Sequence, residues 1–296
     1  MTEPVETERT ETERTETERT DRPLAVPAPA APAAIAAPAA IAATSASAAG
    51  REGPPSLVNV AAITTAGTMI WIGLLWLVVA AGFGIVLGVV AAAGSSDHSL
   101  WQHGFSGWQR FIPFAAGLSM TSTFAPMLVG NGVTRARVAT AATVTLVVVA
   151  VAGGLFVALG YGVERLAFDA LGWRHELSDG RRLSDGGYVR VGVAYAALFA
   201  CYFASGWLIG VARGVLGRDG FAPLVVPALI PAVAAELLLR PEVTGLPFAG
   251  RLGLDRLPQP SLTLGLLAAL TATALATWAA HAGSRHITLP IAGGPR

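Results

Sequence analysis

The sequence predicts an all-α polytopic membrane protein, and three observations support this prediction. Of the 296 residues, 53% are hydrophobic and 13% are charged, and the mean hydropathy is +0.57. Soluble chains carry about 25% charged residues, which excludes an ordinary soluble domain. Beyond residue 56 the apolar residues run continuously through charge-free windows and do not alternate as they would in a membrane barrel. Backbone groups in lipid have to be satisfied within each segment, so these windows are expected to be helices.

The first 56 residues differ in composition from the rest of the chain. Residues 6–20 repeat the pentapeptide ETERT three times, and residues 23–50 are a charge-free stretch interrupted by five prolines. Neither segment has enough large apolar side chains to bury, so burial cannot compensate for the conformational entropy lost on folding. We therefore predict a disordered tail at 1–56, an ETERT repeat followed by an Ala/Pro linker. The N-terminus has neither the basic start nor the apolar stretch of a secretory signal, so no signal peptide is expected.

The first charge-free window, 53–96, is 44 residues long and exceeds one membrane crossing. A spanning helix needs about 20 mainly apolar residues. The polar residues of 64–68 lower the hydropathy of the middle of the window. We therefore divide it into an N-terminal interfacial helix at 57–67 and a first span at 69–93. The alternative is a hairpin of two spans, but 57–67 is too short to cross.

Five further windows complete a six-helix transmembrane domain at 57–285, followed by a short C-terminal tail at 286–296. The fifth window is bordered by Glu236 and reaches span length through the three leucines that follow it. The predicted spans are about 69–93, 111–130, 138–160, 191–212, 221–239 and 262–283.

Six spans place both termini on one side of the membrane. That side carries seven arginines when the membrane-proximal Arg51 is included, and the other carries nine, so the count does not decide the orientation. We expect a plasma-membrane protein with both termini in the cytoplasm, because the loops on that side hold their arginines tight against the membrane. A polar tail without a signal also stays in the cytosol more readily than it is exported. Trp101, Trp108 and Trp173 fit the expected outer interface as anchors.

The most distinctive local sequence is the exit of the second span, GNGVTRARV at 130–138. Gly130, Asn131 and Gly132 predict a tight turn, and Arg135 and Arg137 end the span at the membrane surface. From these residues alone, the favoured interpretation is the turn of a helical hairpin with positive-inside anchors.

A longer pattern favours a functional interpretation of the same segment. It consists of four groups of residues: Leu57, Val58 and Asn59; Phe114, Ala115, Ala116 and Gly117; Gly132, Val133, Thr134 and Arg135; and Glu164 with Gly172 and Trp173. Over about residues 57–240 the chain resembles the bacterial membrane subunits of the ABC-2 transporter permease type, above all short actinobacterial versions without a fused ATPase. In that family the connection between spans two and three touches the ATPase. The resemblance therefore implies an ATPase-coupling loop made of Asn131, Gly132, Val133, Thr134, Arg135 and Arg137.

Small residues recur at a spacing of four in two spans. Gly206, Gly210 and Gly214 lie in the fourth span, and Gly84 and Gly88 lie in the first. This spacing places the glycines on one helix face, where helix backbones approach closely. Such a face serves either packing within the chain, which is the commoner case, or a dimer interface.

Pro223, Pro227 and Pro231 also recur at a spacing of four, in the fifth span. Each proline removes a backbone donor and frees a carbonyl one turn earlier. We expect a kinked fifth helix, which either lines a substrate pathway or is simply bent.

Glu164 and Glu236 are the acidic residues nearest to the predicted spans, and both lie at outer ends. An intramembrane charge is by default a functional candidate. The favoured interpretation is nevertheless an interfacial ion pair, since Glu236 is four residues from Arg240 and Glu164 is adjacent to Arg165.

Several chemistries are excluded by what the chain lacks. It contains no lysine, so it has no ordinary Walker A site, lysine Schiff base or Ser–Lys pair. Its single cysteine, Cys201, excludes an internal disulfide and a multi-cysteine metal site. The five histidines show no metal-ligand spacing. We expect no catalytic constellation, no cofactor, no bound metal and no nucleic-acid partner.

The expected function is that of a permease subunit of an ABC-type transporter, with a separate ATPase subunit as its energy source. The expected partners are the lipid bilayer, that ATPase, and a second copy of the chain or a related permease. The alternative is a non-transporting membrane scaffold or regulator that recruits cytosolic partners through its tail, because a permease has no need of such a tail.

Overall fold

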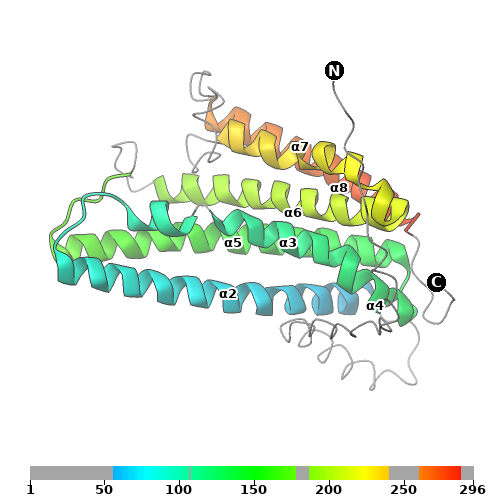
Figure 1. Cartoon of the computed structure of the whole chain (residues 1–296), viewed down its shortest axis with the longest axis horizontal. Helices are drawn as coiled ribbons and strands as arrows, with labels where there is room; N and C mark the ends of the chain where they lie inside the picture. Colours follow the sequence, from blue (N-terminus) through cyan, green and yellow to red (C-terminus); the bar gives the residue numbers. More distant parts are fainter. Residues whose placement is uncertain (1–55, 107, 178–186, 240–259, 288–296) are drawn as a thin grey trace, which may run out of the picture.

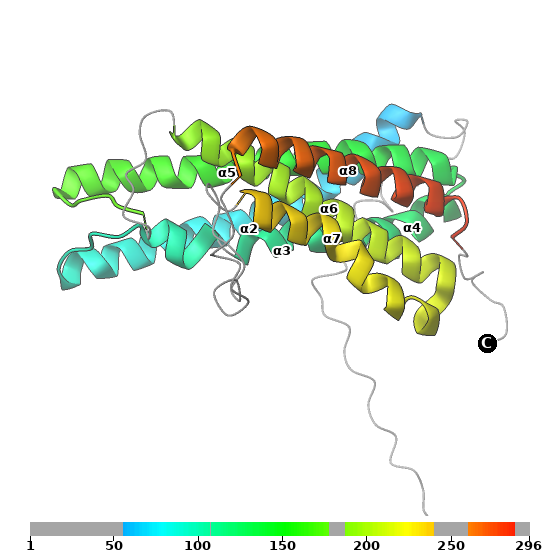
Figure 2. The same ribbon diagram turned by 90° about the horizontal axis from the view of Figure 1, so that it is seen from above.

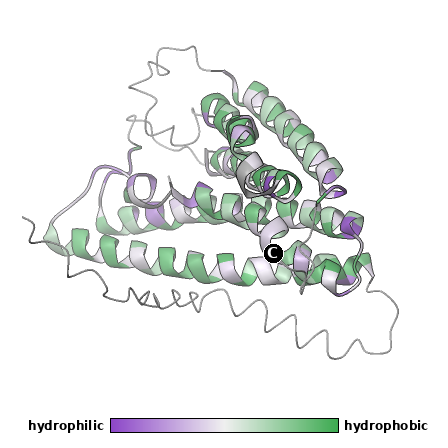
Figure 3. Cartoon of the chain, turned by 45° about the vertical axis from the view of Figure 1, so that its right-hand side comes forward, coloured by the Kyte–Doolittle hydropathy of each residue, from purple (hydrophilic) through white to green (hydrophobic). Residues whose placement is uncertain are grey.

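The computed structural model describes residues 56–106, 108–177, 187–239 and 260–287. Over these residues the chain is a bundle of helices without a β-strand, and six helical segments are long and apolar enough to cross a membrane. Apolar residues follow one another along the length of these helices (Figure 3). The predicted all-α multi-pass membrane fold is confirmed. Residues 1–55 of the predicted tail and 288–296 lie outside the described residues.

The six spans follow the predicted order. The second is a composite of a 3₁₀ turn, two α-helices and an intervening π turn. Another π turn, η2 (Gln102–Ser106), precedes it. The elements are α2 (Leu57–Ala93), η3 (Trp108–Arg110), α3 (Phe111–Ser119), η4 (Met120–Phe124), α4 (Ala125–Gly130), α5 (Arg135–Leu171), α6 (Gly187–Gly220), α7 (Ala222–Leu239) and α8 (Leu262–Ser284).

The division of the first window into an interfacial helix at 57–67 and a span at 69–93 is wrong, because α2 is one continuous helix of 37 residues. Its threonines do not interrupt it. The hydroxyl of Thr64 donates to the carbonyl oxygens of Val60 (3.0 Å) and Ala61 (3.1 Å), so its polarity is satisfied within the helix. The hydroxyls of Thr65 and Thr145 bond to each other at 3.0 Å and join α2 to α5.

Helix α5 also has 37 residues and continues eleven residues past the predicted end at 160. Gly172 terminates it in the left-handed conformation, at φ 72°. At the helical rise, 37 residues measure about 55 Å, against a hydrocarbon core of about 30 Å. Accordingly, α2 and α5 project beyond the other four spans at one end of the bundle (Figures 1 and 2). We call this the Glu164 end and the opposite one the Arg135 end.

Helix α6 is the centre of the bundle and packs against α3, α5, α7 and α8. Its contact with α3 is made by backbone on both sides. A Cβ atom at Gly206 would collide with the carbonyl oxygen of Phe114, and one at Gly117 would collide with that of Phe203. The predicted close packing of the fourth span is therefore intramolecular, as expected for small residues at a membrane helix interface.

We predict that Gly206→Ala lowers the stability of the bundle, because α3 and α6 have to separate to admit the methyl group. Overpacking of this kind costs about 1–3 kcal/mol. Thermal unfolding of the purified chain in detergent measures the effect. Gly84→Ala is the matched control, since nothing lies within 4 Å of a Cβ at Gly84. Equal losses of stability in both variants would contradict the assignment of the α3–α6 contact.

Candidate functional site

The connection between α4 and α5 is a tight turn, as predicted, and its backbone is held by several hydrogen bonds. The Asn131 amide donates to Leu128 O (3.1 Å), and the Asn131 side chain donates to Met127 O (2.7 Å). Gly132 has φ 80°, a conformation that glycine adopts without strain. The Arg137 amide donates to the hydroxyl of Thr134, which caps α5 (3.4 Å).

The turn presents polar side chains outward while one apolar residue anchors it. Val133 is buried, whereas Asn131, Thr134 and Arg135 are exposed and Arg137 is half-buried. A rigid, exposed and positively charged turn at the end of a bundle has the properties of a contact surface for another molecule.

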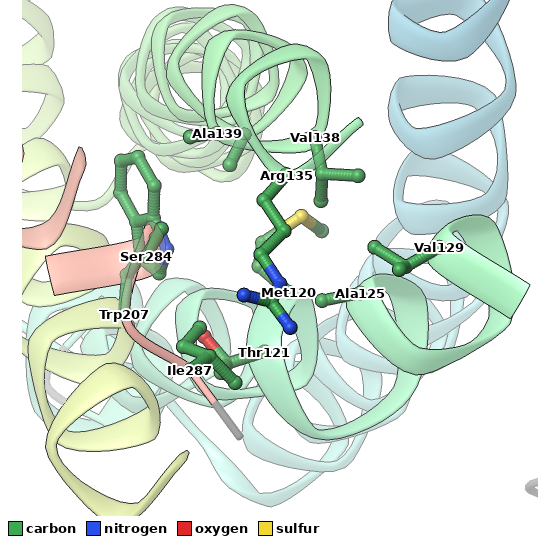
Figure 4. Close-up of a pocket in the computed structure, with 11 residues that line it drawn as sticks. Met120, Thr121, Ala125, Val129, Arg135, Val138, Ala139, Trp207, Ser284 and Ile287 are labelled. Atoms are coloured by element: carbon green, nitrogen blue, oxygen red, sulfur yellow. The ribbon is translucent and has the colours of Figure 1, made fainter. Parts of the chain in front are cut away.

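Arg135 attaches this turn to the rest of the Arg135 end. Its guanidinium donates to the carbonyl oxygen of Arg285, just after α8, at 3.2 Å. It also lines a cavity of about 20 Å³, whose other walls come from η4, α4, α5, α6, the end of α8 and Ile287 (Figure 4). Through one side chain, the turn is therefore bonded to the end of α8 and borders the cavity.

The second span is irregular next to this cavity. The π turn η4 separates α3 from α4, and Pro126 lies at the start of α4. The hydroxyls of Ser119 and Ser122 donate to Ala116 O (2.7 Å) and Leu118 O (3.0 Å). Single π turns of this kind often occur at functional sites. We found no signal for the π turn in the sequence.

Among the described residues, Glu236 contacts partners that are distant from it in the sequence. It is buried near the end of α7 and forms an ion pair with Arg110 of η3, and the hydroxyl of Tyr202 on α6 donates to the same carboxylate oxygen at 2.9 Å. The expected partner, Arg240, lies outside the described residues. Local spacing gave no indication of Arg110, because it precedes Glu236 by 126 residues.

The predicted pair of Glu164 with Arg165 is wrong, because both side chains have other partners. Glu164 is fully buried, and its carboxylate accepts hydrogen bonds from the Ser99 hydroxyl (2.5 Å) and the Trp101 amide (2.7 Å) and contacts His175 Nε2 (2.8 Å). Arg165 instead faces Asp169, at 3.7 Å between Nε and Oδ2. Glu164 thus connects the loop after α2 to the loop after α5 through hydrogen bonds.

The structure also corrects the interface assignment of Trp101. Its side chain is buried and packs edge to face on Phe83, at 5.1 Å between ring centroids. The indole therefore belongs to the packed core at the Glu164 end of the bundle.

The glycines and prolines singled out in the sequence differ in their surroundings. Gly206, Gly210 and Gly214 pack against α3, Thr121 and Ile287, whereas Cβ atoms at Gly84 and Gly88 would meet nothing within 4 Å. Pro223 and Pro227 are exposed and Pro231 is buried, and the cavity beside Arg135 is lined by other residues. A kinked pathway helix remains a prediction.

Among the described residues, no group of three or more His, Cys, Asp or Glu side chains is arranged to hold a metal ion. Comparison of the chain with protein-family models, with curated proteins and with solved structures gave no match.

We predict that Glu236→Ala strongly destabilises the protein, because it leaves Arg110 buried without its carboxylate. Breaking a buried pair costs about 3–5 kcal/mol, whereas replacing both members by apolar residues is often neutral. The double variant Arg110→Met with Glu236→Leu should therefore be more stable than Glu236→Ala. Thermal unfolding in detergent compares the two variants, and a double variant that is less stable than the single one would contradict the ion-pair assignment.

Proposed function

We propose that this chain is the membrane-spanning permease subunit of an ABC-type transporter, acting as a dimer with a separate ATPase subunit. The observation that carries the proposal is the turn at 131–137. It is rigid and exposed, and through Arg135 it contacts the interior of the bundle and the end of α8. A turn that only reversed the chain would not require this attachment.

The geometry suggests how force from a partner would pass into the spans. Closure of the ATPase subunit would push on the turn, from which α5 starts directly as a 37-residue helix. α5 packs along α6, the centre of the bundle, so displacement of α5 would shift α6. The π turn η4 gives the second span a point at which it can bend as α5 moves.

The energy source has to lie in another chain under this proposal. The sequence contains no lysine, and a Walker A site needs one to reach the nucleotide phosphates. ATP hydrolysis therefore belongs to the partner, and this chain supplies the path and the contact.

We further propose that the Arg135 end faces the cytoplasm at the plasma membrane. The charged residues with described side chains at that end are Arg135, Arg137, Arg213 and Arg285, and no acidic residue is among them. At the Glu164 end, arginines are mixed with Asp97, Glu164, Asp169, Glu176 and Glu236. Arginines collect on the cytoplasmic side of membrane proteins, where the leaflet is also negatively charged.

We predict that Arg135→Glu combined with Arg137→Glu abolishes co-purification with ATPase subunits encoded beside this chain. Reversal of two charges replaces attraction by repulsion at the contact. Arg213→Glu is the control, since Arg213 is an exposed arginine at the same end but outside the turn. If no ATPase co-purifies with the unaltered chain, or if the control fails as completely as the double variant, the proposal is contradicted.

A deletion separates this function from the scaffold alternative. A chain lacking residues 1–55 should still bind the ATPase if the turn is the contact. Loss of all partner binding, with membrane insertion intact, would favour recruitment through the tail.

The orientation is tested by thiol labelling in whole cells. The native Cys201 is fully buried, so the background from it is low. We predict that a cysteine at Thr134 reacts with a membrane-impermeant maleimide only after the cells are permeabilised, whereas one at Trp173 reacts in intact cells. The reverse pattern would place the Arg135 end outside.

A further inference from the structure

The cavity beside Arg135 presents hydrogen-bond donors that the described residues leave unused. A guanidinium has five N–H donors, and that of Arg135 makes one bond, to the carbonyl oxygen of Arg285. In the part of the chain that the structure describes, no carboxylate forms an ion pair with Arg135. Figure 4 shows this side chain extending from the start of α5 across the cavity toward Thr121.

Thr121 supplies a second, buried donor on the opposite wall. Its residue exposure is 7%, and its hydroxyl oxygen has no hydrogen-bond partner among the described residues. The hydroxyl of neighbouring Ser122, by contrast, donates to Leu118 O at 3.0 Å. Space for the Thr121 side chain comes from Gly210, because a Cβ there would lie 3.0 Å from the Thr121 hydroxyl oxygen. A buried hydroxyl without a partner destabilises a protein unless a ligand or water satisfies it.

The character of the walls selects an anion. Besides Arg135 and Thr121, the lining includes Trp207, whose indole N–H is a donor only, and it includes no acidic residue. The cavity volume of about 20 Å³ exceeds the roughly 10–15 Å³ that one water needs, so it admits one oxygen atom of a larger group. The rest of that group would remain at the mouth, beside the exposed Arg135.

We propose that this cavity binds the phosphate group of an anionic phospholipid, with one phosphate oxygen between the Arg135 guanidinium and the Thr121 hydroxyl. Charge-assisted bonds from arginine to phosphate are among the strong ones in proteins. The site lies at the end of the spans, at the level of lipid headgroups. Because headgroup phosphates lie at this level, we take a phospholipid and not a free phosphate ion as the source of the phosphate group. This inference does not depend on the proposed transport function.

The experiment is native mass spectrometry of the full chain, released from nanodiscs that contain equal amounts of phosphatidylglycerol and phosphatidylcholine. We expect a retained phosphatidylglycerol adduct in the unaltered chain. Arg135→Gln should weaken retention about tenfold, as expected for loss of a charge-assisted hydrogen bond. Thr121→Val, which keeps the shape of the side chain, should weaken it severalfold.

Arg213→Gln is the matched control and should retain the lipid within about twofold, because a surface arginine away from the cavity contributes only diffuse attraction. Circular dichroism and gel filtration of each variant confirm folding, and Thr121→Val serves as the test should Arg135→Gln not fold. Equal retention of phosphatidylcholine, or equal loss in Arg213→Gln and Arg135→Gln, would overturn the proposal. So would thermal stabilisation by inorganic phosphate that requires Arg135 while phosphatidylglycerol has no effect.

Discussion

The bundle depends on the contact between α3 and α6, where two backbones meet because Gly117 and Gly206 have no side chains. This contact fixes the position of the second span against the central helix. At one end it aligns Arg110 and Tyr202 with Glu236 of α7. At the other end it places Thr121 and Trp207 on facing walls of the cavity beside Arg135. The Glu236 site and the cavity beside Arg135 therefore both follow from one close approach of helices.

The polar groups inside the bundle illustrate how a membrane fold satisfies buried charge. Glu164 and Glu236 are each buried, and each is contacted by groups from at least two other segments. Burying an unpaired charge in surroundings of low dielectric constant costs a large free energy. Each buried carboxylate therefore needs these contacts, and the contacts fix the segments that supply them relative to one another. Glu164 does this for the loops at the Glu164 end, and Glu236 does it for η3, α6 and α7.

The fold class and the number of spans could be predicted from the sequence because continuous apolar runs of about 20 residues admit few other structures. The tight turn at Gly130–Gly132 was also predictable, since glycine and asparagine favour its backbone angles. The ends of α2 and α5 were not. Charged or hydroxyl-bearing residues such as Thr64 and Glu164 were taken as boundaries, whereas in the structure their polar atoms are satisfied by bonds to the helix or to a distant loop.

Partners of charged residues were the least predictable feature. Sequence reasoning pairs a glutamate with an arginine one or four residues away, yet Glu236 pairs with Arg110 across 126 positions. The cavity beside Arg135 is built in the same way from segments between Met120 and Ile287. Such sites form when distant segments pack together, so the spacing of residues along the sequence does not predict them. The sequence did indicate the segment 130–138 as distinctive, and the structure adds the direction in which Arg135 points.

The central claim is that the turn at 131–137 receives a partner and passes its movement into the bundle. A photo-crosslinking amino acid at Ala136, an exposed position within the turn, tests this most directly in living cells. We expect a crosslink to an ATPase subunit, identified by mass spectrometry, and none from the exposed Ala222 at the same end of the bundle. Crosslinks from Ala136 that contain no ATPase, in cells that express one beside this chain, would contradict it.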